Sequence, residues 1–177
     1  NIYDVMSQVQ DTIPVLIKST ISLEGWYNLK YKFPRHNITF SPEYLRSNTA
    51  NDDLEKCETI SLGGDGIEYW SELFNNCDKD ISISDPKELI IAKVFRNAFL
   101  ATKVSFFNQI FDYCKKTDIN FDQVVQEICA DTRIGHSHTK VTKERGFGGH
   151  CFPKDTVAIL KSADNNNVDL NIIRSAV

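Results

Sequence analysis

The sequence lacks the features that mark a protein for a membrane, for secretion or for nucleic acid. No stretch approaches the ~20 uninterrupted apolar residues of a membrane span. Residues 1–10 have neither the basic start nor the apolar run of a signal peptide. The 20 Lys and Arg residues are outnumbered by 24 Asp and Glu residues, which gives a net charge of −4, whereas nucleic-acid-binding domains are usually basic. We therefore expect a cytoplasmic protein whose partners include neither nucleic acid nor a membrane.

Cysteine is scarce, and its spacing argues against two structural roles. The chain has five cysteines with no CxxC pair among them: Cys57, Cys77, Cys114, Cys129 and Cys151. An odd number without paired spacing argues against a disulfide framework and against a zinc ribbon. His136, His138 and His150 precede Cys151, but no carboxylate or second cysteine stands nearby at metal-ligand spacing. We expect no bound metal, and we interpret most of the cysteines as small core residues in a reducing compartment.

The residues that are present suffice for a folded core. The chain has 177 residues, of which 41% are hydrophobic and 25% are charged, and this composition excludes a disordered tail. In the first half, short apolar runs at residues 13–19, 37–41, 58–62 and 81–84 predict strands of a parallel sheet, and residues 67–76 predict a helix. The expected fold class is therefore α/β.

A long helix is predicted to begin at Pro86. Asp85, Pro86 and Glu88 occupy the N-cap and the first and third positions of a helix start. Neither Gly nor a further Pro follows before about residue 116. The apolar residues fall on nearly every face, so we expect a core helix that also packs against a partner chain. Two more helices are predicted, one at residues 121–130 and one from about Asp155 to the asparagines that follow Asp164.

The most distinctive segment is the run GFGGHCFPKD at residues 146–155. A glycine-rich turn lets the backbone approach a ligand closely, and Lys154 and Asp155 follow Cys151 near an expected helix start. Such an electropositive setting activates a thiol as a nucleophile. The alternative interpretation is a buried structural cysteine beside a loop, and the spacing alone leaves both open.

This run closely resembles the active-site segment of the UDP-glucose dehydrogenase family, the nucleotide-sugar 6-dehydrogenases. Four further segments resemble family motifs in the same order, at residues 15–20 (VLIKST), 41–50 (SPEYLRSNTA), 93–110 (KVFRNAFLATKVSFFNQI) and 131–135 (DTRIG). The resemblance implies the fold of the family, in which an NAD-binding Rossmann domain and a UDP-binding domain are joined by a central helical domain that forms the dimer.

The resemblance divides the chain into two parts. Residues 1–84 match the C-terminal part of the NAD-binding domain, and residues 85–177 match the central dimerisation domain that carries the catalytic cysteine. We expect a partial Rossmann-like parallel sheet, consisting of its last strands only, followed by an all-α domain with one long buried helix. The chain has no GxGxxG fingerprint and no nucleotide-sugar domain, so it is expected to be an internal piece of a longer enzyme.

The resemblance also implies a reaction, the NAD-dependent two-step oxidation of UDP-glucose to UDP-glucuronate. The 6-hydroxyl becomes an aldehyde, and Cys151 matches the nucleophile that carries the thiohemiacetal and the thioester. Lys93 and Asn97 match an active-site pair that stabilises the oxyanion, and their four-residue spacing places them on one helix face. Asp155 matches a family aspartate that could act in proton transfer or could only cap its helix.

Further residues match family positions with roles in binding or hydrolysis. Glu43 matches the glutamate of thioester hydrolysis, and Thr20 matches a threonine near the nicotinamide and the catalytic water. The residues expected at the cofactor are Ser19, Thr20, Glu43 and Lys154. The residues expected to bind the substrate are Tyr44, Leu45, Arg46, Lys93, Asn97, Arg133, Phe147 and Gly148. Arg133 matches an arginine that reaches the neighbouring subunit's site, whereas Ser47 replaces a second glutamate that many members carry.

Two alternatives remain open at this point. The chain by itself could be an inactive dimerisation scaffold rather than an enzyme. The parent enzyme could act on GDP-mannose or on a UDP-N-acetylhexosamine instead of UDP-glucose. Residues 136–145 match no family motif, and neither this stretch nor His150 receives a role.

Overall fold

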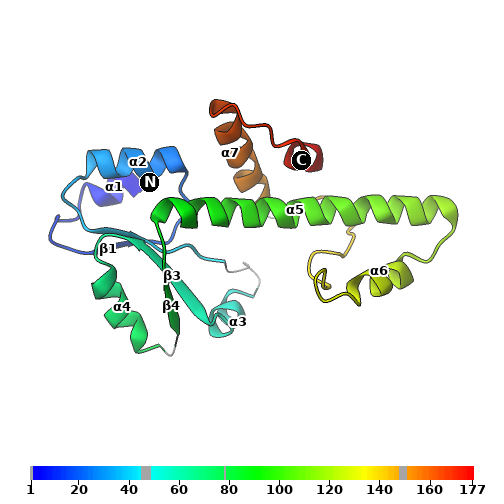
Figure 1. Ribbon diagram of the computed structural model, residues 1–177, viewed down its shortest axis with the longest axis horizontal. Helices are drawn as coiled ribbons and strands as arrows, with labels where there is room; N and C mark the ends of the chain where they lie inside the picture. Colours follow the sequence, from blue (N-terminus) through cyan, green and yellow to red (C-terminus); the bar gives the residue numbers. More distant parts are fainter. Residues whose placement is uncertain (1, 45–48, 78, 148–150) are drawn as a thin grey trace. The chain divides into compact units, whose positions relative to one another are not determined.

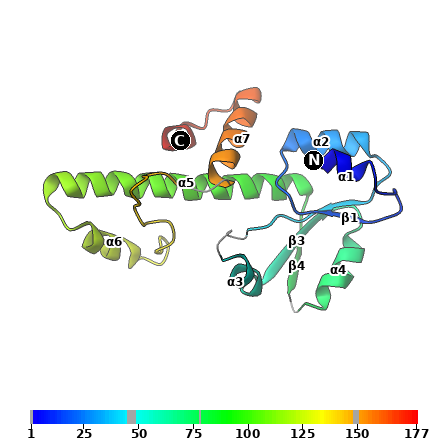
Figure 2. The same ribbon diagram turned by 180° about the vertical axis from the view of Figure 1, so that it is seen from behind.

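The computed structural model describes residues 2–44, 49–77, 79–147 and 151–177. The chain forms two compact units, Asn1–Lys93 and Val94–Val177. Figures 1 and 2 show the same ribbon from opposite sides, with a small sheet and short helices in the first unit and helices in the second. The expected α/β class, followed by a helical part with one long helix, is confirmed.

Four strands form a single sheet in the first unit. They are β1 (Val15–Ile17), β2 (Ile38–Phe40), β3 (Thr59–Gly64) and β4 (Asp80–Ile83), in that spatial order. The pairs β1–β2 and β3–β4 are parallel, as predicted. The pair β2–β3 is antiparallel, with Thr39 opposite Gly64, so the expectation of a purely parallel sheet is wrong here. Glycine allows this close pairing, because a β-carbon at Gly64 (φ +116°) would lie 2.4 Å from the carbonyl oxygen of Ile38.

The first unit also contains four short helices. They are α1 (Ile2–Met6), α2 (Leu23–Lys32), α3 (Ala50–Glu55) and α4 (Ile67–Asn75). The sequence interpretation predicts α4 but not α2, although α2 has a local start signal. The Ser22 hydroxyl accepts a hydrogen bond from the backbone N–H of Gly25 at 3.0 Å, as an N-cap does. Trp26 and Leu29, three residues apart on one face of α2, are both buried.

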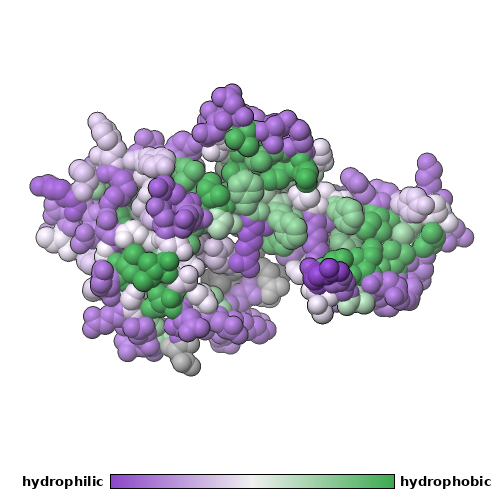
Figure 3. Space-filling model, in the orientation of Figure 1, coloured by the Kyte–Doolittle hydropathy of each residue, from purple (hydrophilic) through white to green (hydrophobic). Residues whose placement is uncertain are grey.

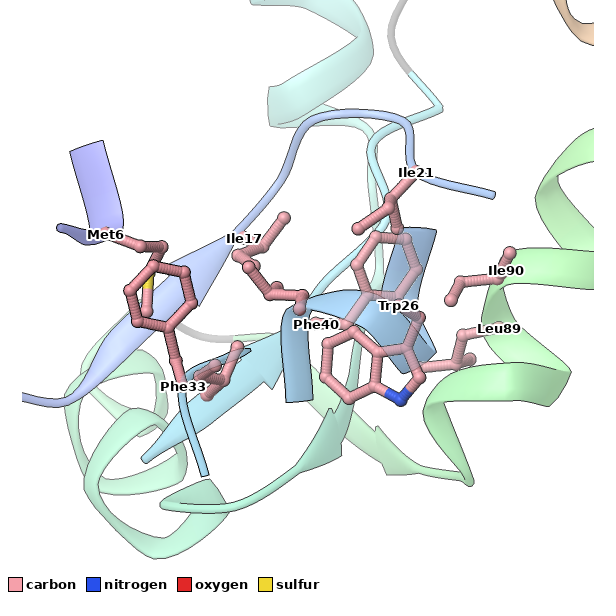
Figure 4. Close-up of a cluster of buried hydrophobic side chains, with 10 residues drawn as sticks. Met6, Ile17, Ile21, Trp26, Phe33, Phe40, Leu89 and Ile90 are labelled. Carbon is pink, nitrogen blue, oxygen red and sulfur yellow. The ribbon is translucent and has the colours of Figure 1, made fainter. Parts of the chain in front are cut away.

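The core of the first unit includes the start of the long helix. Figure 4 shows the buried cluster, in which Ile17 and Phe40 of the sheet, Met6 of α1 and Trp26 of α2 are joined by Leu89 and Ile90. The rings of Trp26 and Phe40 lie 6.3 Å apart. Burying a side chain of this kind contributes about 1.5–3 kcal/mol. Two such residues therefore fix the first turns of the long helix to the first unit.

The long helix, α5 (Pro86–Thr117), begins where the sequence predicts and by the predicted means. The carboxylate of Asp85 accepts a hydrogen bond from the backbone N–H of Lys87 at 2.8 Å. The carboxylate of Glu88 accepts one from the backbone N–H of Asp85 at 3.3 Å. This reciprocal arrangement is a capping box, and the 32 residues that follow it span about 48 Å at 1.5 Å per residue.

In the second unit, α5 has one buried stripe and one exposed aromatic stripe. The buried side chains are Val94, Ala98, Ala101, Val104, Phe107 and Cys114. Phe99, Phe106 and Tyr113 are 67%, 57% and 66% exposed, respectively. They recur every seven residues and so lie on one face of the helix. Within the described chain, nothing buries this aromatic face, although the helix was expected to be buried on all sides.

Three more helices complete the second unit, α6 (Phe121–Cys129), α7 (Cys151–Asn165) and α8 (Asn171–Ala176). Figure 3 shows apolar side chains at the surface over α6 and beside α7. Helix α7 starts four residues before the predicted Asp155, because Pro153 is tolerated in a first turn, where no N–H is needed. Asp155 lies in the second turn, so the interpretation of Asp155 as the cap of this helix is wrong.

The cysteines divide by unit. Cys114 and Cys129 are buried, as expected of small core residues, whereas Cys57 is half-buried and Cys77 is exposed. The expectation therefore fails for the two cysteines of the first unit. Among the described residues, the model contains no helix that is both long and apolar enough to cross a membrane.

Candidate active site

A buried carboxylate–amide pair joins α7 to α5 in the second unit. Asp155 is 1% exposed, and its Oδ2 accepts a hydrogen bond from Nδ2 of Asn97 at 2.7 Å. Its Oδ1 is also buried and has no hydrogen-bond partner among the described residues, although the ammonium of Lys154 stands 3.7 Å away. Buried polar atoms are nearly always hydrogen-bonded. Oδ1 is therefore an acceptor that can take a proton or a hydrogen bond from a further group.

The same bond fixes the orientation of the Asn97 amide. An ionised carboxylate only accepts hydrogen bonds, so the side of Asn97 that faces Asp155 must be its NH₂ group. An amide NH₂ has two donors, and Asp155 uses one of them.

Cys151 is the first residue of α7, one helical turn before Asp155. Residues four apart lie on one face of a helix, so the backbone places the cysteine on the face that bears the buried carboxylate. The partial positive charge of a helix start favours a thiolate there. The side chain of Cys151 itself lies outside the described part of the structure.

Lys93 is buried, with 8% of its surface exposed, and lies one turn before Asn97 on α5. The helix therefore confirms the sequence-based placement of both residues on one face. Lys93 is the last residue of the first unit, and Asn97 belongs to the second.

In the first unit, three predicted residues gather at the carboxyl ends of two parallel strands. Ser19 and Thr20 follow β1, and Glu43 follows β2. The ammonium of Lys18 lies 3.3 Å from Oε1 of Glu43, so the two strand ends are adjacent. The carboxyl ends of parallel strands are where α/β sheets bind their ligands. Tyr44 follows Glu43 and is half-buried.

Arg133 lies in an exposed loop, where Asp131 holds its guanidinium. Nε of Arg133 donates to both carboxylate oxygens of Asp131, at 2.9 and 3.0 Å. These hydrogen bonds lower the pKa of Asp131 and raise the pKa of Arg133. The Arg133 side chain is 86% exposed, so its guanidinium is accessible to solvent.

The remaining predicted residues are less buried or are not described. Phe147 is half-buried and Lys154 is exposed. Leu45, Arg46 and Gly148 lie outside the described residues. No group of three or more His, Cys, Asp or Glu side chains among the described residues could hold a metal ion.

The structure also identifies contacts that the sequence interpretation missed. The ammonium of Lys103 donates to the carbonyls of Ile134 and Gly135, at 2.6 and 3.0 Å. The ring of His138 lies 5.5 Å from that of Phe152, the residue after Cys151. These contacts hold the loop between α6 and α7 against α5, through Lys103, and against α7, through Phe152. The available signal was a concentration of charge in a stretch without a family motif, which does not reveal which carbonyls a lysine reaches.

Comparisons with known proteins identify the family of the chain. The model of the UDP-glucose/GDP-mannose dehydrogenase family, central domain, matches residues 88–177. The chain belongs to the UDP-glucose/GDP-mannose dehydrogenase family. Its similarity to UDP-glucose 6-dehydrogenases extends over both units.

Two curated relatives illustrate this similarity. The UDP-glucose 6-dehydrogenase of Campylobacter jejuni is 33% identical over 183 residues, which cover 100% of this chain and 46% of the relative. That of Streptococcus pneumoniae is 32% identical over 182 residues, covering 96% of this chain and 45% of the relative. The chain thus spans less than half the length of these family members.

A solved structure agrees with the fold. The UDP-glucose dehydrogenase of the archaeon Pyrobaculum islandicum superposes with a TM-score of 0.80 at 26% sequence identity. The match covers 92% of this chain and 39% of that chain. Together with the family match, this similarity supports the expected Rossmann-like character of the first unit and the helical character of the second.

Proposed function

We propose that this chain carries the catalytic cysteine of an NAD-dependent nucleotide-sugar 6-dehydrogenase that converts UDP-glucose to UDP-glucuronate. The observation that carries the proposal is the buried Asp155, bonded to Asn97 and one turn after Cys151. A nucleophile position, an oriented amide donor and a buried carboxylate on two packed helices are the parts that acyl chemistry on a thiol requires. The family match supports a nucleotide sugar as the substrate.

The residues of the first unit fit the cofactor. NAD, when bound, supplies the hydride acceptor for each of the two oxidations. Ser19 and Thr20 follow β1 at the edge of the sheet where α/β folds bind ligands, and Glu43 follows the neighbouring parallel strand. Small hydroxyl side chains at a strand end leave room for a flat ring and can donate hydrogen bonds to it. Lys154 remains a proposed cofactor contact because its ammonium is exposed.

The cysteine makes the second oxidation possible. The thiolate of Cys151 adds to the carbonyl carbon of the aldehyde, and the thiohemiacetal oxygen takes up the negative charge. Loss of a hydride from this carbon gives a thioester. Water then attacks the thioester, the carbon–sulfur bond breaks, and the products are the carboxylate and the free thiol. For each acid formed, two hydrides leave the substrate for two NAD molecules and one water is consumed.

The other residues stabilise or move charge in these steps. The ammonium of Lys93 and the second N–H of Asn97, one turn apart on α5, would donate to the oxyanion. Asp155 holds the amide in place and presents Oδ1 as a proton acceptor. Glu43, which is exposed at its strand end, would activate the hydrolytic water. Thr20 would hold that water near the cofactor.

The aromatic stripe of α5 supports a homodimer. Phe99, Phe106 and Tyr113 would form an apolar face of the kind that a soluble monomer rarely leaves exposed. A second copy of the same helix covers such a face through two-fold symmetry. Arg133, exposed on a loop of the same unit, would then be available to the substrate bound by the partner subunit.

The aromatic stripe also favours a second candidate function, in which the isolated chain is only a dimerisation scaffold. An activity measurement distinguishes the enzyme from the dimerisation scaffold. We replace the matched part of the Campylobacter jejuni enzyme with this chain and measure NADH formation from UDP-glucose, beside the isolated chain. The enzyme proposal predicts two NADH per UDP-glucuronate in the chimera.

Cys151→Ser in the chimera should abolish acid formation, while the control Cys57→Ser should retain it. Full acid formation by the Cys151→Ser chimera would refute the assignment of the nucleophile. Higher activity on GDP-mannose or a UDP-N-acetylhexosamine would refute UDP-glucose as the substrate.

A further inference from the structure

The loop between α6 and α7 contains a stretch, residues 136–145, that has no role in the sequence interpretation, yet contacts at both ends of this stretch attach the loop to α5. Figures 1 and 2 show it running beside the second half of α5. Lys103 of α5 holds its beginning through the carbonyls of Ile134 and Gly135. Arg145 holds its end, two residues before Phe147.

Arg145 contacts three residues on one face of α5. Its Nη1 donates to the backbone carbonyl of Asn108 at 3.3 Å, and its Nη2 donates to the carboxylate of Asp112. Its guanidinium lies 4.8 Å from the centre of the Phe111 ring. In return, the amide of Asn108 donates to the backbone carbonyl of Arg145. Side chain and backbone of Arg145 are therefore both attached to the helix.

This attachment is more elaborate than stability requires. The side chains of Arg145 and Asp112 are 36% and 61% exposed, and exposed ion pairs contribute little to folding. The backbone of Arg145 is nevertheless held at φ +59°, a left-handed conformation that a β-carbon disfavours. The contacts thus fix the direction in which the backbone continues after Arg145.

That direction matters because Cys151 follows six residues later. Six residues reach at most about 20 Å, so the position of Arg145 limits where the thiol can lie. The far side of this link is held separately, by the bond from Asn97 to Asp155 and by the contact of His138 with Phe152.

We propose that Arg145 is a positioning residue for Cys151. It acts by fixing the backbone just before Gly146 through its contacts with Asn108, Phe111 and Asp112. The proposal rests on the proposed function in that Cys151 is the nucleophile. Arg145 touches neither substrate nor cofactor in this account and acts through the chain that it anchors.

The test follows the thiols of the 177-residue chain by mass spectrometry. Iodoacetamide labelling of Cys151 is measured from pH 5 to 10 in the wild type, Arg145→Ala, Arg145→Lys and Asn108→Ala. Buried Cys114 and Cys129 report general loosening, because they are labelled only if the unit opens. Arg174→Ala is the matched control, since Arg174 also forms an exposed ion pair in this unit, with Asp164.

We expect Arg145→Ala and Asn108→Ala to move the midpoint of Cys151 labelling toward the ordinary thiol value of about 8.5. At pH 7 the labelling should slow by about threefold or more. Arg145→Lys should resemble Arg145→Ala, because lysine keeps the charge but lacks the planar fork and the stacking. Arg174→Ala should leave the midpoint unchanged, and Cys114 and Cys129 should stay protected in every variant.

An unchanged midpoint in folded Arg145→Lys and Asn108→Ala would overturn the proposal, as would labelling of Cys114 and Cys129 in parallel with Cys151. Hydrogen exchange separates this failure from failure of the proposed function. If wild-type Cys151 is labelled like exposed Cys77 at every pH, the assignment of the nucleophile fails. Faster exchange confined to residues 145–157 in Arg145→Ala would then still support the anchor, and unchanged exchange would overturn it.

Discussion

The amide of Asn97 has two N–H donors, and we assign them to two different partners. One N–H of the amide is bonded to the buried carboxylate of Asp155, and we propose that the second donates to the oxyanion formed at Cys151. The sequence predicts that Lys93 and Asn97 share a helix face, because a spacing of four residues is enough to establish this. It does not predict the bond to Asp155, which joins residues 58 positions apart. That contact depends on how α7 packs on α5, and no local pattern encodes it.

The bond from Asn97 to Asp155 should matter for stability. Asn97→Ala leaves the carboxylate buried without this donor, and removing one partner of a buried pair costs about 1–3 kcal/mol. Urea unfolding of the chain measures this loss. Asn171→Ala is the control, because Asn171 donates to Asp169 in an exposed pair. Equal losses of unfolding free energy in the two variants would show that the buried pair stabilises the fold no more than the exposed pair does.

Lys93 should matter for rate rather than for binding. In the chimera, Lys93→Ala is expected to lower kcat by roughly 10²–10³, the usual effect of losing one oxyanion donor. KM for UDP-glucose should change much less, because the charge on oxygen develops only in the transition state. An unchanged kcat would remove Lys93 from the mechanism.

At the level of elements, the start of α5 and two parallel strand pairings were predicted correctly, whereas the third pairing and the start of α7 were not. The start of α5 could be predicted because Asp85 and Glu88 lie within one turn of the backbone groups that they bind. The antiparallel pairing of β2 with β3 could not, because it depends on Gly64 meeting a strand more than twenty residues away. The start of α7 was predicted four residues too late, at Asp155 instead of Cys151.

The capping box makes the start of α5 sensitive to acid. The hydrogen bond from the backbone of Lys87 lowers the pKa of Asp85 below its ordinary value of 3.8. A carboxyl group with a lowered pKa in the folded state stabilises the fold above its unfolded pKa, and this effect is lost as the pH falls through the folded pKa.

The melting temperature of the chain should therefore be higher than that of Asp85→Asn at pH 7. The difference between the two melting temperatures should disappear as the pH falls below about 3.8. Asparagine is itself a good N-cap, so the comparison isolates the charge. A gap that stays constant down to pH 2 would contradict this account of the helix start.

The aromatic stripe of α5 should hold two chains together. Light scattering is expected to give about twice the chain mass of 20.2 kDa. Phe99→Asp or Phe106→Asp places a charge in the apolar face and should yield monomers or insoluble protein. Tyr31→Asp, at an 89% exposed aromatic residue of the first unit, should leave the dimer intact. A stable wild-type monomer at micromolar concentration would refute the interface.

At the level of the whole molecule, the chain combines two units with different tasks. The first presents Ser19, Thr20 and Glu43 at the end of a small sheet, and the second carries Asn97 and Asp155 on packed helices. The family could be predicted from the sequence because five short motifs occur in order. The loop anchored by Arg145 could not be interpreted in this way, because its contacts are specific to the packing on α5.

The central claim is that Cys151 carries the substrate as a thioester, and trapping that thioester tests it most directly. Glu43→Gln in the chimera should slow hydrolysis while leaving both oxidations possible. After incubation with UDP-glucose and NAD, mass spectrometry of the digested protein should find the uridine-diphosphoglucuronyl group on the peptide that contains Cys151. The adduct should be absent from a chimera that carries both Glu43→Gln and Cys151→Ser. Formation of the acid without any adduct on Cys151, or an adduct that survives Cys151→Ser, would contradict the account.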